Sequence, residues 1–230
     1  MKLLVSDFDG TFDSRNSRSA IDKNIEAIKR FRDQGNIFAI ATGRHYESIR
    51  KKIEKYQIPY DYLVCADGIS TFDSDDKLLG FFPIHIETLI KIMEKLYELE
   101  FIKNIELIDM YGNQTENYQD VCEIYIEVSF RNITDLKRFR KTLRELSTFR
   151  IFNIMRIKEI VDKTNGIEII QAKKGIDRTK IYTVGNEIND YQMLKRYNGY
   201  KMPLSNPMIQ GHGIKLTPNV RALVRKLEGK

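Results

Sequence analysis

Three short apolar runs that each end in polar residues constrain the fold of this chain most strongly. The runs are Leu3–Val5, Ile37–Ala41 and Ile181–Val184, and each has the length and composition of a buried strand. Small, hydroxyl, amide or acidic side chains follow each run. Because ligands of open α/β sheets bind beyond the carboxyl ends of the strands, we expect a functional site where these runs end.

Segments with helical periodicity lie between the first apolar runs. Apolar residues recur at helical spacing over residues 21–31 and 46–56, and Gly35 and Pro59 follow as stop signals. The order strand, helix, strand, helix, strand as far as Val64 predicts a parallel sheet with right-handed crossovers. We therefore predict an α/β fold with a Rossmann-like parallel sheet core.

A different pattern begins near Leu79. Strict alternation of apolar and polar residues over 123–130 predicts a sheet with one buried face and one solvated face. We interpret this part as an inserted α+β domain at residues 81–164, and we assign residues 1–80 and 165–230 to the core. Helices are expected over 86–97 and 133–146, and further strands near 105–108, 151–157 and 167–170.

Two carboxylates, Asp7 and Asp9, come soon after the first apolar run and precede Gly10 and Thr11. At a strand end, one carboxylate and the next backbone carbonyl can face the same point, which suits Mg²⁺ and its preference for oxygen ligands. A carboxylate can also act as a covalent nucleophile toward phosphorus. The same residues would suit a solvated Asp-Gly turn, so this pattern alone leaves both interpretations open.

Taken together, the motifs resemble those of the haloacid dehalogenase (HAD) superfamily of phosphotransferases, in particular its Cof-type sugar-phosphatase branch. The resemblance covers nearly the whole chain and implies that the inserted domain is the family's larger α/β cap. It rests on D-F-D-G-T at 7–11, I-A-T-G-R at 40–44, C-A-D-G-I at 65–69 and V-G-N-E-I-N-D at 184–190, which occur in the family's order.

The catalytic and metal-binding residues are implied by this resemblance. Asp7 would be the nucleophile that forms an aspartyl-phosphate, and Asp9 would be the general acid and then the general base. The cofactor would be Mg²⁺. Its protein ligands would be Asp7, the Asp9 carbonyl, Asn186 and Asp190.

The resemblance also implies a set of phosphate-binding residues. A cation is part of that set, and two candidates compete for the position, Arg178 and Lys174. Thr42 alone would equally suit a helix N-cap, and Arg44 could reach either substrate or a surface acid. The expected phosphate contacts are Phe8, Thr42, Gly43, Asn189 and either Arg178 or Lys174.

Two positions depart from the family pattern. Asn186 stands where the family usually has a metal-binding Asp, so metal attraction should weaken unless Glu187 or Asp190 compensates. Asp67 stands where the family often has Asn. A carboxylate near a phosphate site would repel an anion, so Asp67 is expected to lie in a turn or to meet a sugar hydroxyl.

The formal charge of +6 first suggests a nucleic-acid partner. The basic residues are scattered, and no nucleic-acid-binding motif accompanies them, so we expect no such partner. No apolar run is long enough to cross a bilayer, no signal peptide is evident, and Cys65 and Cys122 lack metal-ligand spacing. We therefore expect a cytoplasmic protein without a membrane partner.

The connection between residues 170 and 181 is short. Ten residues cannot hold a standard covering helix if 167–170 is a strand, because a parallel crossover usually needs a dozen or more. One sheet face would then lack its cover, which a second copy of the chain, the basic C-terminal helix around 220–227 or a rearranged neighbour could supply; a homodimer is the first hypothesis.

The function predicted from all of these features is hydrolysis of a small phosphorylated metabolite by an HAD-type phosphoric monoester hydrolase that depends on Mg²⁺. A sugar phosphate is one candidate substrate. Two alternatives stay open: a phosphosugar mutase of the same superfamily, and a catalytically weakened HAD protein that binds phosphorylated ligands.

Overall fold

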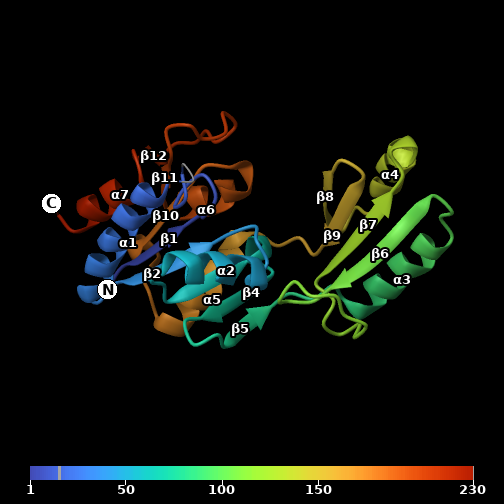
Figure 1. Ribbon diagram of the computed structural model, residues 1–230, viewed down its shortest axis with the longest axis horizontal. Helices are drawn as coiled ribbons and strands as arrows, with labels where there is room; N and C mark the ends of the chain where they lie inside the picture. Colours follow the sequence, from blue (N-terminus) through green and yellow to red (C-terminus); the bar gives the residue numbers. More distant parts are fainter. Residues whose placement is uncertain (15–16, 230) are drawn as a thin grey trace. The chain divides into compact units, whose positions relative to one another are not determined.

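The computed structural model describes residues 1–14 and 17–229, which form two compact units (Figure 1). Met1–Gly80 and the residues from Asp162 onward make the first unit, called the core below. Phe81–Val161 make the second unit, called the cap. The chain therefore leaves the core once and returns to it once.

The core is built on an eight-stranded sheet in the order β12-β11-β10-β1-β2-β3-β4-β5. The strands from β12 to β3 pair in parallel, and β3 pairs with β4 antiparallel. The central strands are buried over their whole length, as expected when helices cover both faces of a parallel sheet. Their bounds are β1 (Leu3–Ser6), β2 (Ile37–Ala41), β3 (Tyr62–Cys65), β4 (Ser70–Asp73), β5 (Leu78–Phe81), β10 (Ile181–Gly185), β11 (Asn198–Lys201) and β12 (Lys215–Leu216).

Helices cover both faces of this sheet. On one face, the buried residues of α5 and α6 pack in one cluster with alternate residues of the strands. On the other face, α1 packs on β2 and on α7, and α2 packs on β3. The helices are α1 (Arg18–Asp33), α2 (Tyr46–Tyr56), α5 (Lys163–Lys174), α6 (Tyr191–Arg196) and α7 (Val220–Leu227), with the 3-10 turns η1 (Ala66–Gly68), η3 (Arg178–Lys180) and η4 (Ile188–Asp190).

The prediction that one sheet face lacks a covering helix is wrong. Ile167 and Ile170 lie in helix α5 rather than in a strand, and both side chains are fully buried in the core cluster. The β-branched residues at 167–170 are typical of a strand, and the signals that mark the helix lie before and after this run. Asp162 accepts a hydrogen bond from the backbone of Thr164 as N-cap, and Gly175 ends the helix at φ +61°. The argument for a homodimer loses its basis.

The cap is a four-stranded antiparallel sheet in the order β6-β7-β9-β8 with helices on one face. The alternation predicted over 123–130 is confirmed at its centre, since Ile124, Ile126 and Val128 are fully buried against the cap helices. The elements are α3 (Ile86–Tyr97), β6 (Ile102–Ile108), β7 (Glu123–Val128), η2 (Phe130–Asn132), α4 (Ile133–Arg140), β8 (Ser147–Ile151) and β9 (Ile154–Lys158).

Two details of the cap differ from the sequence predictions. The strand expected near 151–157 is a hairpin of β8 and β9, because Phe152 takes a left-handed conformation at φ +50° and turns the chain. Helix α4 ends at Arg140 instead of continuing to residue 146. Leu143 and Leu146 lie in the segment after the helix, and both are buried. The fold class, a Rossmann-like core with an inserted antiparallel α+β cap, is confirmed.

Length and apolarity together decide whether a helix could cross a bilayer. None of the helices in the described part of the chain has both.

Candidate active site

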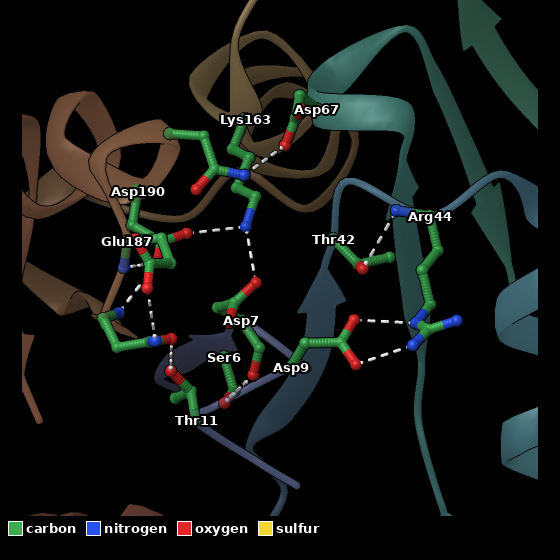
Figure 2. Close-up of polar contacts among 12 residues, drawn as sticks. Ser6, Asp7, Asp9, Thr11, Thr42, Arg44, Asp67, Lys163, Glu187 and Asp190 are labelled. Atoms are coloured by element: carbon green, nitrogen blue, oxygen red, sulfur yellow. Dashed lines mark hydrogen bonds and ion pairs between the residues drawn. The ribbon is translucent and has the colours of Figure 1, made fainter. Parts of the chain in front are cut away.

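The candidate site lies where β1, β2 and β10 end, and Figure 2 shows its polar contacts. Asp7 directly follows β1, and its backbone N–H donates to the carbonyl of Val184 on β10 at 2.9 Å. Thr42 directly follows β2, and Asn186 directly follows β10. Because these strands are parallel, the residues that follow the three apolar runs of the sequence come together at the carboxyl end of the sheet.

Asp7 is buried and its carboxylate is paired. Its Oδ1 accepts a hydrogen bond from Nζ of Lys163 at 2.6 Å, and only 6% of the residue is exposed (Figure 2). The pKa of Asp7 is raised to about 7, mainly by burial and also by the carboxylate of Asp190, against the opposing effects of the Lys163 ammonium and the Phe8 N–H. The carboxylate is thus held in one orientation in a site largely closed to water.

Lys163 is the first residue of α5 and is fully buried. Its ammonium bridges Asp7 and Asp190, with both Nζ–O distances at 2.6 Å. Burial alone would lower the pKa of Lys163, but the carboxylates of Asp7, Asp190 and Asp67 outweigh that effect and raise it. The other oxygen of Asp190 accepts the backbone N–H groups of Asn186 at 2.8 Å and Glu187 at 2.9 Å.

Asp9 makes a bidentate pair with Arg44. The guanidinium donates from Nε and Nη2 to the two carboxylate oxygens, each at 2.7 Å (Figure 2). This pair raises the pKa of Arg44 above its usual value. About half of the Asp9 side chain is exposed, so the pair lies at the open side of the site.

The loop after β2 brings Thr42 and Gly43 next to Asp67. Thr42 is buried, and its hydroxyl accepts the backbone N–H of Arg44 at 3.1 Å. A Cβ added to Gly43 would lie 3.3 Å from each carboxylate oxygen of Asp67. Asn189, which lies in η4, donates from Nδ2 to Asp67 at 2.8 Å.

The side-chain amide of Asn186 lies where Asp7 and Asp9 converge. In one orientation its Oδ1 accepts from the hydroxyl of Thr11 at 2.7 Å. With the amide turned over, its nitrogen donates to the Asp9 carbonyl at 3.0 Å, to Oδ2 of Asp7 at 3.2 Å and to Thr11. One amide atom therefore faces a carboxylate oxygen and a carbonyl oxygen at close range.

These distances suit Mg²⁺. Adjacent ligands on an octahedral Mg²⁺ at about 2.1 Å lie roughly 3.0 Å apart. The Asn186 amide stands at such distances from Oδ2 of Asp7 and the Asp9 carbonyl. Within residues 1–14 and 17–229, no group of three or more His, Cys, Asp or Glu side chains is placed to hold a metal. The donors here are instead one carboxylate, one carbonyl and one amide.

Comparison with known proteins settles the family. The sequence model of the haloacid dehalogenase-like hydrolases matches residues 4–134 and 103–217, which together cover most of the chain. The chain belongs to this family. The resemblance inferred from the four motifs, including the Cof-type branch, and the predicted hydrolase class are therefore confirmed.

The curated relatives of this HAD-like hydrolase are distant in sequence, and solved structures of low sequence identity share its fold. The Bacillus subtilis protein named 5-amino-6-(5-phospho-D-ribitylamino)uracil phosphatase YitU is 20% identical over 229 residues, covering 84% of this chain and 83% of that protein. BT1666 from Bacteroides thetaiotaomicron, described among phosphatases of the HAD superfamily, has a TM-score of 0.78 at 20% identity, covering 100% of this chain and 94% of that one. The sugar phosphatase BT4131 has a TM-score of 0.72 at 16% identity, covering 100% and 98%.

Most of the predicted site residues of this HAD-like hydrolase come together, but the predicted cations do not. Arg178 is exposed and donates from Nε to the carbonyl of Arg196 at 2.8 Å. Nζ of Lys174 lies 5.9 Å from the ring centre of Tyr62. The structure places Lys163 beside Asp7 instead, so the sequence predictions for the cation are corrected.

A signal for Lys163 was present in the sequence. Asp162 and Asn165 form a capping box at the start of α5, and a lysine that directly follows an N-cap belongs to the first turn of a helix. Sequence reasoning placed residues 81–164 in the cap and read 167–170 as a strand. These predictions therefore place the cation later in the chain, at Lys174 or Arg178.

Two further predicted residues, Asp190 and Phe8, have surroundings that the sequence does not specify. Asp190 accepts N–H groups on both oxygens and so orients Lys163 and the loop after β10, while its predicted role at the metal stays a prediction. Phe8 offers only its backbone to the site, because its side chain is fully buried and stacks near Phe12.

Proposed function

We propose that this HAD-like hydrolase is a Mg²⁺-dependent phosphatase that hydrolyses a small phosphorylated metabolite through an aspartyl-phosphate on Asp7. One observation carries the proposal. One oxygen of the buried Asp7 carboxylate is bound by Lys163, while the other lies 3.2 Å from the amide position of Asn186, beside the Asp9 carbonyl.

Asp7 is the proposed nucleophile. A carboxylate can attack phosphorus and form an acyl phosphate, which splits hydrolysis into two easier steps. Lys163 orients this carboxylate and supplies a positive charge where two anions must approach each other. Asp190 keeps the ammonium in place from the other side.

Mg²⁺ is the proposed cofactor, with Asp7, the Asp9 carbonyl and Asn186 as its protein ligands. When bound, the ion neutralises negative charge on the phosphoryl group. The donor set fits a hard cation, because all three groups can present oxygen. Asn186 contributes no formal charge, so the affinity for Mg²⁺ should be lower than with a carboxylate at this position.

Asp9 is the proposed general acid and base. Its carboxylate now accepts two N–H groups of Arg44, so it must separate from Arg44 before it can deliver a proton to a leaving group. The pair lies on the open side of the site, where a substrate could displace the guanidinium.

The phosphoryl group of the substrate is proposed to lie beside Thr42, Gly43 and Lys163. A buried hydroxyl, a backbone N–H and an ammonium are the donors that recognise phosphate oxygens. Distant relatives are named as phosphatases of a phosphoribityl compound and of sugars, which supports a small polyol or sugar phosphate as substrate.

A panel of phosphate monoesters assayed for phosphate release with and without Mg²⁺ tests this proposal. We expect Mg²⁺-dependent turnover of at least one sugar or polyol phosphate by the wild-type protein. Release that persists in EDTA, or no release from any ester at saturating Mg²⁺, would contradict it. In the second case, measurable binding of inorganic phosphate would favour a protein that only binds phosphorylated ligands.

A further inference from the structure

The loop that follows β3 holds an unusual backbone conformation. Ala66 and Asp67 are consecutive non-glycine residues with positive φ, at 48° and 55°. Such conformations are unfavourable for residues with a Cβ and gather at functional sites. Two hydrogen bonds impose them: Ala66 N–H donates to the carbonyl of Arg44 at 2.8 Å, and Asp67 N–H donates to that of Thr42 at 2.9 Å.

This conformation places the carboxylate of Asp67 against the proposed phosphate-binding loop. Both of its oxygens lie 3.3 Å from the position of a Cβ on Gly43, so a side chain there would push the carboxylate away by a few tenths of an ångström. The side chain is half-buried, and its hydrogen-bond donor is the neutral amide of Asn189. A carboxylate therefore lies beside the backbone N–H that is proposed to bind phosphate.

The charge of Asp67 acts on the ammonium of Lys163 through space and contributes to the raised pKa of that lysine, but no direct ion pair joins the two side chains. Asp9 is paired with Arg44, and Asp7 shares Lys163 with Asp190. In the described residues, Asp67 forms no salt bridge with any lysine or arginine. Its negative charge therefore acts on whatever lies next to the reacting phosphoryl group.

We propose that Asp67 is a specificity-determining residue that restricts the substrates to phosphate monoesters without a second anionic group near the phosphorylated carbon. This inference rests on the proposed function, because it needs the phosphoryl group beside Gly43. Like charges a few ångströms apart in a partly buried site repel each other strongly, whereas a hydroxyl or ammonium of the leaving group can donate to the carboxylate. The favoured class is esters of neutral or cationic alcohols, such as polyols, sugars and amino sugars.

A matched pair of substrates tests the charge directly. The phosphorylated carbon of 2-phosphoglycerate carries a carboxylate where that of glycerol 2-phosphate carries a hydroxymethyl group. The two substrates are otherwise the same. For wild type, kcat/KM should favour glycerol 2-phosphate. In Asp67→Asn the preference should fall about tenfold, because asparagine keeps the shape and tolerates positive φ but carries no charge.

Two controls separate charge from fold. Asp177→Asn removes an equal charge from an exposed turn that precedes β10, at the opposite end of the strand from the site, and should leave the preference unchanged. Asp67→Gly also tolerates positive φ and should lower the preference as Asp67→Asn does. An unchanged preference in both Asp67 variants would overturn the inference.

A binding measurement tests Asp67 even if no ester is hydrolysed. Calorimetric titration of wild type and Asp67→Asn with inorganic phosphate in Mg²⁺ should show several-fold tighter binding to the variant. Equal or weaker binding to the variant, or no binding to either protein, would overturn the role of Asp67. Absence of turnover with tighter phosphate binding would instead count against the proposed function alone.

Discussion

At the scale of single residues, the site is organised around one buried lysine between two buried carboxylates. Lys163, Asp7 and Asp190 are each no more than 6% exposed, and the two Nζ–O distances are both 2.6 Å. Charges removed from water in this way are tolerated only when they are paired and hydrogen-bonded. Each member of the triad therefore depends on the other two.

Lys163→Met should both unfold the protein more easily and inactivate it. Removing the ammonium leaves two carboxylates buried together, which costs roughly 3–5 kcal/mol of unfolding free energy. Chemical denaturation and phosphate release measure the two effects. Lys174→Met is the matched control, because Lys174 is exposed on the same helix and should tolerate the change. Full activity in Lys163→Met would contradict the proposed role of this lysine in catalysis.

Asn186→Asp should tighten Mg²⁺ binding. The change adds one negative charge where the amide meets Asp7 and the Asp9 carbonyl, and ligand charge tunes the affinity of such sites, here by about tenfold. Activity titrated with Mg²⁺ should show a lower half-saturating concentration. Gln57→Glu makes the same chemical change at the far end of α2 and should have no effect. An unchanged or higher value in Asn186→Asp would mean that this side chain does not face the ion.

At the scale of elements, the loop after β3 packs against the first turn of α5 and fixes its position. Gly68 has φ +98°, and a Cβ there would lie 2.0 Å from the carbonyl oxygen of Asp162. Asp162 is the N-cap of the helix that begins at Lys163. The glycine thus lets two backbones approach closely, and the approach sets where the lysine enters the site.

Gly68→Ala should therefore lower activity as well as stability. The substitution forces Asp162 away and strains the backbone, at about 2 kcal/mol or more. Gly175→Ala is the control, because Gly175 also has positive φ but nothing lies within 4 Å of an added Cβ. It should lose about 1 kcal/mol and keep its activity. Equal losses of kcat/KM in both variants would contradict the role of Gly68 in positioning the start of α5.

Sequence reasoning located the strand ends but not every residue that reaches them. Asp7, Thr42 and Asn186 are predicted site residues because they follow apolar runs within one or two residues and lie in motifs that resemble those of the HAD family, and parallel pairing brings such strand ends together. Lys163 was missed because its position depends on where α5 begins. The run at 167–170 has strand-like composition, but it lies inside the helix that Asp162 caps and Gly175 ends, where Ile167 and Ile170 are buried in the core cluster.

At the scale of the whole molecule, the two units have separate hydrophobic clusters. The core cluster joins the parallel strands to α5 and α6, and the cap cluster joins the antiparallel strands to α3 and α4. The residues that meet around Asp7 all belong to the core. Binding of Mg²⁺ should therefore act on the core directly.

Hydrogen exchange measured with and without Mg²⁺ tests this division. We expect slower exchange in the segments 7–13 and 186–190, because ligand binding stabilises the folded state that holds the ligands. Exchange in β6, β7, β8 and β9 should change little. Equal slowing in the cap strands would contradict a metal site contained in the core.

The most direct test of the central claim is phosphate release by Asp7→Asn. An amide keeps the shape at the end of β1 but cannot form the acyl phosphate, so the rate should fall more than about a thousandfold while circular dichroism stays native. Mass spectrometry of wild type during turnover should place the added phosphoryl group on Asp7. A folded Asp7→Asn protein that keeps more than about a tenth of the wild-type rate would contradict Asp7 as the nucleophile.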